Sequence, residues 1–251
     1  MRNRLQTIGY NRTVKLEWLD YTADLLNSGR SEREIHTALT DLLREELSPD
    51  SDAKRGSRGK TITILLKTWA SVPRSLVAFR NVGLKLLADR TGRDRLLPHW
   101  GMTIAAYPFF RTVSEVTGRL LRLQGNAGAA QIQRRVRERV GERETVARSA
   151  RYVIRAMIDW GILVETAEKG VYTADAQMSI TRPEEVAWLV EAELHAAEQG
   201  PYSLKGILGS PSLFPFRVES DRSPVFETER VELIRHAVND ELVSLRASRQ
   251  F

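Results

Sequence analysis

Three amphipathic segments, each followed by glycine, most constrain the fold of this chain. Apolar residues recur every three or four positions in 102–123, 129–140 and 144–160, with glycines between one segment and the next. This is the spacing of helices that bury one face. Two short apolar runs follow, 162–165 and 171–174, with a glycine in the turn between them, as in a β-hairpin. We therefore expect three helices that lead directly into a hairpin, with the first helix interrupted at a proline.

The first hundred residues have a helical pattern with one break. Ser31 followed by Glu34 predicts a capping box at the start of one helix. Residues 48–60 are rich in Gly, Ser, Asp, Lys and Arg, and we expect a loop there. Apolar residues at helical spacing predict helices over residues 13–27, 31–47, 61–70 and 73–90.

The C-terminal part combines a helix with less regular sequence. A helix is predicted to begin near Thr181 with a capping box to Glu184, to end before Gly200 and to carry an acidic outward face. A short strand is predicted over 214–219. Residues 231–245 allow either a helix or two strands, and we favour a small β element. The sequence thus predicts a mainly α fold with a helical N-terminal domain over 1–97, a central domain over 98–176 and an acidic α+β region over 177–251.

The element order of residues 102–176 resembles that of the winged helix-turn-helix superfamily. Asp159-Trp160-Gly161-Ile162-Leu163 resembles the point where the recognition helix of that superfamily enters its two-stranded wing. The resemblance implies that the helix over 144–160 is a recognition helix, which in such proteins enters the major groove of DNA.

A second resemblance concerns two short stretches. Arg119-Leu120-Leu121-Arg122-Leu123-Gln124 and Arg143-Glu144-Thr145-Val146 resemble sequences in small helical accessory proteins of bacterial BREX-type phage-defence islands. This resemblance implies a role in anti-phage defence.

The net charge of +6 conceals a strong segregation of charge along the chain. Residues 54–155 carry 22 Lys and Arg against 6 Asp and Glu, whereas the rest of the chain carries 16 against 26. A basic segment of this density is typical of proteins that bind a polyanion, most often nucleic acid. Charges that are close in sequence need not share one face, so a merely solvated surface is the competing interpretation.

Candidate DNA contacts lie on the face of the third helix opposite its apolar side. Arg148 has the donors for a bidentate pair with guanine, and arginine is also suited to phosphate. The preceding helix and the hairpin tip add further cations. The predicted DNA-binding residues of this region are Arg134, Arg135, Arg137, Thr145, Arg148, Ser149, Arg151, Tyr152, Arg155 and Lys169. The glutamates of 138–144 offer these arginines ion pairs at helical spacing, which is the structural alternative.

A second basic group precedes the helix predicted over 61–70. Lys54, Arg55, Arg58 and Lys60 are candidates for contact with the DNA backbone. A phosphate-binding loop of the Gly-x-x-x-x-Gly-Lys-Ser/Thr type is not predicted, because position 54 is Lys and no apolar strand precedes the segment. Whether this group shares a face with the third helix is left open by the sequence.

Catalytic and metal-binding signatures are sparse. The chain has no cysteine, which excludes disulfides, thiolate metal sites and cysteine nucleophiles and agrees with a reducing compartment. The four histidines are scattered along the sequence. The aromatic residues between Trp100 and Phe110 have the spacing typical of a buried core. We expect a non-enzymatic protein without cofactor or metal, and, because no apolar stretch has membrane length, a cytoplasmic one.

The leading hypothesis is therefore a double-stranded DNA-binding protein that acts as a regulator or as an accessory component of anti-phage defence. Other subunits would be contacted through the acidic C-terminal region. The alternative is a scaffold subunit whose winged helix binds a protein partner, since this fold also serves protein interaction. RNA binding comes third because aromatic residues available for stacking are few.

Overall fold

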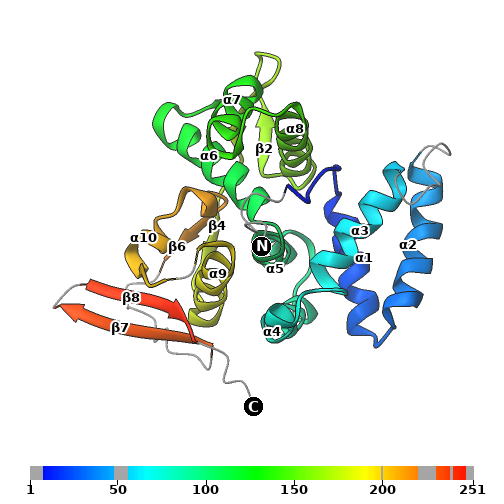
Figure 1. Cartoon of the computed structure of the whole chain (residues 1–251), viewed down its shortest axis with the longest axis horizontal. Coiled ribbons are helices and arrows are strands. Elements are labelled where there is room, and N and C mark those ends of the chain that lie inside the picture. Colours follow the sequence, from blue (N-terminus) through cyan, green and yellow to red (C-terminus); the bar gives the residue numbers. More distant parts are fainter. Residues whose placement is uncertain (1–7, 48–55, 199, 220–229, 238–239, 247–251) are drawn as a thin grey trace.

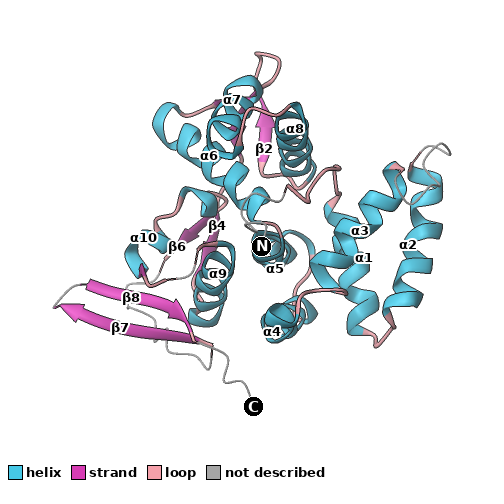
Figure 2. Cartoon of the chain, viewed as in Figure 1, coloured by secondary structure: helices cyan, strands magenta, loops and turns pink. Residues whose placement is uncertain are grey.

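The fold is mainly helical, as the sequence predicted, and its strands form small sheets of two or three (Figures 1 and 2). The computed structural model describes residues 8–47, 56–198, 200–219, 230–237 and 240–246.

The N-terminal helices pack around buried apolar stripes. They are α1 (Leu16–Asn27), α2 (Glu32–Glu46), α3 (Ser57–Trp69) and α4 (Val77–Ala88), and the 3-10 helices η3 (Arg74–Leu76) and η4 (Gly92–Arg95) flank α4. The capping box predicted at the start of α2 is confirmed: the Ser31 hydroxyl accepts from the Glu34 N–H, and the Glu34 carboxylate accepts from the Ser31 N–H. Ile35, Leu39 and Leu43 are its buried stripe.

The loop predicted over 48–60 is wrong from Ser57 onward, because α3 begins there. Arg58, in the first turn of α3, is buried, and its guanidinium donates to the Leu43, Arg44 and Leu47 carbonyls at the end of α2. Arg58 therefore donates hydrogen bonds to the C-terminus of α2, where the last carbonyls lack partners within the helix.

The central helix α5 (Leu96–Ala106) is surrounded by other elements. Every residue from 96 to 105 is buried, and α5 packs against α1, α3, α4, α6 (Pro108–Gln124) and α9 (Pro183–Ala196). Pro108 occupies the first turn of α6, so the predicted helix over 102–123 is two helices broken at this proline. The predicted boundary between 97 and 98 falls within α5.

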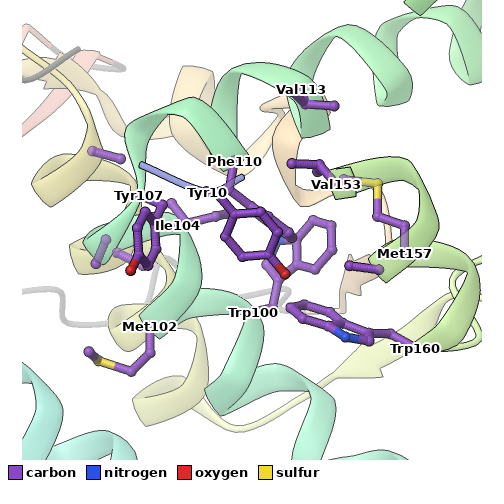
Figure 3. Close-up of a cluster of buried hydrophobic side chains, with 14 of the residues drawn as sticks. Tyr10, Trp100, Met102, Ile104, Tyr107, Phe110, Val113, Val153, Met157 and Trp160 are labelled. Carbon is purple, nitrogen blue, oxygen red and sulfur yellow. The ribbon is translucent and has the colours of Figure 1, made fainter. Parts of the chain in front are cut away.

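An aromatic cluster joins the N-terminal segment to α5, α6 and the end of α8 (Glu144–Asp159) (Figure 3). The Phe110 ring stacks on Trp160 at 5.4 Å between centroids, and Trp100 meets Phe110 edge-on at 5.2 Å. Tyr10 lies against Tyr107 and Phe110. All five side chains are buried, so this aromatic sequence forms core, as predicted.

A compact unit follows α6. Its elements are β1 (Ala127–Gly128), α7 (Ala129–Val140), α8, β2 (Leu163–Glu165) and β3 (Val171–Ala174). β2 and β3 are the predicted hairpin, and β1 pairs antiparallel with β3 through Ala127 and Tyr172, which gives the strand order β1-β3-β2.

The C-terminal elements include the β structure that the sequence left ambiguous. They are β4 (Met178–Ile180), α9, β5 (Tyr202–Ser203), α10 (Leu204–Leu208), η5 (Pro211–Leu213), β6 (Phe216–Val218), β7 (Val231–Ala237) and β8 (Asp240–Leu245). β4 and β6 pair in parallel, and the other three strands have the order β5-β8-β7. Residues 231–237 and 240–245 thus form two strands, as favoured. The capping box predicted at Thr181 is absent, because Arg182 is the N-cap of α9 and its side chain makes no capping hydrogen bond.

The prediction of an acidic outward face on α9 is wrong. Three of its glutamates are buried, and each is paired with an arginine from another element. The pairs are Glu185 with Arg90, Glu191 with Arg230 at 2.6 Å, and Glu193 with Arg111 at 2.7 Å. Burial of charge is tolerated here because each carboxylate has a guanidinium partner. These carboxylates are consequently unavailable to another subunit.

Candidate nucleic-acid interface

The helix α8 has one buried and one exposed face, as its sequence predicted. Val146, Ala150, Val153 and Met157 are buried at helical spacing. Thr145, Arg148, Arg151 and Arg155 are exposed on the other side. Because positions three and four apart are neighbours on a helix, the three arginines form one row along α8.

The arginines of this row have no ion pair with any residue in the part of the chain that the structure describes. Among the residues that the structure describes, no carboxylate lies within 4.0 Å of Arg148, Arg151 or Arg155, and the same is true of Arg143, the N-cap of α8. Sequence reasoning did not select Arg143. The only available signal was its position just before the helix.

Arginines of α7 are different, because each has a glutamate partner. Arg134 and Arg135 both approach Glu138, at 3.8 and 3.2 Å, and Arg137 approaches Glu142 at 3.5 Å. The pairs of Arg134 and Arg135 are exposed, and such pairs contribute little stability. These two arginines can therefore exchange a carboxylate for a phosphate at small cost.

Two residues predicted to contact DNA from α8 point elsewhere. Ser149 is buried, with 3% of its surface exposed. Tyr152 is half-buried, and the Arg12 guanidinium lies 5.5 Å from the centre of its ring. The prediction treated every polar side chain of α8 as outward, whereas Ser149 lies toward its packed side and the N-terminal segment covers part of Tyr152.

The hairpin tip is exposed, and Lys169 lies on it. Gly170 follows with a φ of +78°, a left-handed conformation that favours glycine. The Glu165 carboxylate accepts from the Gly170 N–H at 2.8 Å and thereby fixes the turn. Glu168 is also at the tip, so Lys169 is accompanied by two carboxylates and the tip is not cationic overall.

The second predicted basic group is not assembled as a loop. Lys54 and Arg55 lie outside the described residues. Arg58 is directed to the end of α2, as described above, and Lys60 is half-buried on α3. The first turn of α3 does approach α8, since Ser57 and Thr61 line one cleft together with Arg155.

The imidazole of His99 and the carboxylate of Asp20 lie close together, but both ring nitrogens already make hydrogen bonds within the protein. His99 Nδ1 accepts from the Trp69 indole N–H at 3.0 Å, so Nε2 carries the proton and donates to Asp20 at 2.8 Å. Burial lowers the pKa of His99. Neither nitrogen is free to accept a proton from a substrate, and the arrangement joins α1, α3 and α5.

Comparisons with models of known protein families, with curated proteins and with solved structures find no significant match. Within the described residues, no helix has both the length and the apolarity needed to cross a bilayer. The same residues contain no group of three or more His, Asp or Glu side chains arranged to hold a metal ion.

Proposed function

We propose that the protein binds double-stranded DNA through residues 108–174, which we interpret as a winged helix-turn-helix. The order α6, β1, α7, α8, β2, β3 supports this interpretation, as does the pairing of β1 with β3, which ties the hairpin to the start of α7. In this fold α8 is the recognition helix and the β2–β3 hairpin is the wing.

The observation that carries the proposal is the row of exposed arginines on α8, for which the described residues provide no ion pair. An arginine already paired with a carboxylate must give up that pair before it neutralises a phosphate. Arg148 and Arg151 have no such partner among the described residues, and both lie on the face that a recognition helix presents to DNA. Arginine also provides the planar, bidentate donors that suit phosphate and guanine.

The positions along α8 suggest a division of roles. Thr145 and Arg148 are in its first half, which in this fold reaches base edges, and Arg148 has the donors to pair with O6 and N7 of guanine. Arg151 lies one turn further on and is assigned to phosphate. Arg134 on α7 and Lys169 at the hairpin tip would contact the DNA backbone on either side of α8.

The biological role that we propose is regulation of transcription or an accessory part in anti-phage defence. The second role rests on the resemblance of residues 119–124 and 143–146 to BREX accessory proteins. The competing function is that of a scaffold subunit, in which the same arginine row would face an acidic protein.

A fluorescence-anisotropy titration on duplex DNA at several salt concentrations tests the proposal. Each phosphate contact contributes a slope of about 0.9 to the dependence of log affinity on log salt. The double variant Arg148→Ala/Arg151→Ala should therefore bind much more weakly and reduce this slope by about 0.9, the contribution of the phosphate contact assigned to Arg151.

The matched control is Arg33→Ala/Arg74→Ala, which removes the same charge from exposed arginines on α2 and η3. It should bind DNA nearly as wild type does. Circular dichroism establishes that each variant is folded. No binding by the wild type at low salt, or equal affinities of the two double variants, would overturn the proposal in favour of the scaffold function.

A further inference from the structure

The N-terminal segment before α1 places a further arginine beside the cationic row of α8. In Figure 1 this segment, in dark blue, runs between α8 and α3. The Arg12 guanidinium lies 5.5 Å from the centre of the Tyr152 ring, which is within the distance of a cation–π contact. Arg12 and Tyr152 also line one cleft together with Arg155. The segment is thus placed on the side of α8 that carries exposed arginines.

The position of Tyr152 on α8 determines which arginines Arg12 accompanies. Tyr152 comes four residues after Arg148 and three residues before Arg155. Residues three and four apart are neighbours on the surface of a helix, so Tyr152 lies next to both arginines. Arg12, which lies over the Tyr152 ring, therefore widens the cationic surface of α8 with a residue from a distant part of the sequence.

The Arg12 guanidinium has donors that the fold does not use. One N–H group, on Nη1, donates to the Asn11 carbonyl at 2.6 Å. No carboxylate of a described residue lies within 4.0 Å of Arg12, and no other hydrogen bond joins it to the described part of the chain. A ring contact occupies the flat face of a guanidinium, whereas its N–H groups lie along the edge. The remaining edge donors are therefore available to a phosphate.

Lys15, on the same segment, has the opposite arrangement. Its ammonium group is held by Glu46 at 2.6 Å and by Glu17 at 3.2 Å, and it lies over the Trp18 ring. Two carboxylates beside one ammonium group leave no net positive charge for a phosphate. Of the two cations, Arg12 is the one suited to bind an anion.

We propose that Arg12 binds a backbone phosphate of the DNA that lies on α8, and that Tyr152 is a positioning residue that holds Arg12 in place. The N-terminal segment becomes a second DNA-contacting element, a role that rests on the proposed function. The Tyr152 ring restricts the Arg12 side chain before DNA arrives, which reduces the entropy lost when the phosphate contact forms.

Fluorescence-anisotropy titrations of the full chain on duplex DNA, repeated over a series of salt concentrations, test the role of Arg12. Arg12→Ala should weaken binding about tenfold or more, which is the loss expected for a hydrogen bond to a charged group. It should also reduce the slope of log affinity against log salt by about 0.9, because one phosphate contact is removed. Wild-type affinity and slope in Arg12→Ala would overturn this role.

Lys15→Ala is the matched control, because it removes the same charge from the same segment but from a cation that two carboxylates already neutralise. It should leave the slope close to that of wild type. Equal losses of affinity and slope in Lys15→Ala and Arg12→Ala would indicate general attraction by the basic surface and refute a specific contact. Circular dichroism establishes that both variants are folded.

Two substitutions of Tyr152 test its positioning role. Tyr152→Phe keeps the ring, and the hydroxyl makes no hydrogen bond with the described residues, so DNA affinity should equal that of wild type. Tyr152→Leu should weaken binding about two- to tenfold and retain the slope, because Arg12 keeps its charge but must be ordered on binding. In the Arg12→Ala protein, Tyr152→Leu should have no further effect. A loss in Tyr152→Phe, or equal losses from Tyr152→Leu with and without Arg12, would overturn the positioning role.

The role of Arg12 and the proposed function can fail separately. If Arg148→Ala/Arg151→Ala loses the DNA affinity of the wild type and Arg12→Ala keeps it, only the assignment of Arg12 is wrong. If the wild type does not bind DNA at low salt, both are wrong.

Discussion

Gly118 provides a direct test of how α6 packs against the C-terminal part of the chain. It faces η5, and a Cβ atom added at position 118 would lie 2.0 Å from the Pro211 carbonyl oxygen and 2.9 Å from Phe214 Cβ. The oxygen belongs to the main chain, and Cβ does not move with rotation of the Phe214 side chain. Gly118→Ala thus requires α6 and η5 to move apart.

The cost follows from two opposing effects. Overpacking of a close-packed interior typically destabilises by about 1–3 kcal/mol, and the upper end applies because two backbone segments must separate. Alanine recovers about 1 kcal/mol through its higher helix propensity. We expect a net loss of about 2 kcal/mol, which lowers Tm by about 4–8 °C in a chain of this size.

Thermal unfolding followed by circular dichroism measures this change. Gly206→Ala in α10 is the control, because its added Cβ would come no closer than 3.5 Å to another atom, the ordinary contact distance. It should leave Tm unchanged or slightly higher. If Gly118→Ala unfolds at the wild-type temperature, the close approach of α6 to η5 is wrong.

Two further predictions concern stability. Burial lowers the pKa of His99, so the unfolded chain takes up a proton first when the pH falls below about 6.5. Stability measured by urea unfolding should therefore decrease from pH 7 to 5.5 and do so less in His99→Gln; equal slopes in both proteins would refute this. Arg58→Ala leaves carbonyls at the end of α2 without their donor and should cost about 2 kcal/mol in urea unfolding, whereas Lys60→Ala should be nearly neutral. We expect Arg58→Ala to bind DNA as tightly as wild type does. A loss of DNA affinity without a loss of stability would instead place Arg58 in the DNA interface.

The sequence predicted the elements whose pattern is strong and local. The helices α7 and α8 have a single apolar stripe and end at glycine, and the hairpin has alternating residues around Gly170, so their types followed from periodicity and turn chemistry. The strand β1 was missed because two residues, Ala127 and Gly128, form no pattern until β3 pairs with them.

Errors arose where a charged residue has an internal partner. Arg58, Glu191 and Glu193 were expected at the surface because charged side chains are usually exposed. Their partners are α2 carbonyls, Arg230 and Arg111, which are between 11 and 82 positions away in the sequence. No local sequence pattern indicates a partner at such a distance along the chain.

The candidate site was predicted only in part for the same reason. Periodicity placed Arg148 and Arg151 on the exposed face of α8, where the structure has them. It could not indicate that Arg12 would lie over Tyr152, because the approach of the N-terminal segment to α8 depends on tertiary packing. Ser149 was misplaced because a small polar residue fits either side of a helix.

Two hydrogen bonds connect Val14 and the first residue of α1 to the end of α8. The Trp160 indole N–H donates to the Val14 carbonyl at 2.9 Å, and the Leu16 N–H donates to Asp159. These partners are separated by more than 140 residues, so the C-terminal end of α8 is completed only after the first and the central parts of the chain have met. The unit from α6 to β3 is consequently not a transferable module: a fragment cut at residue 102 would leave the Trp160 indole without its acceptor and would lack Tyr10 and Trp100, two of the five rings of the aromatic cluster.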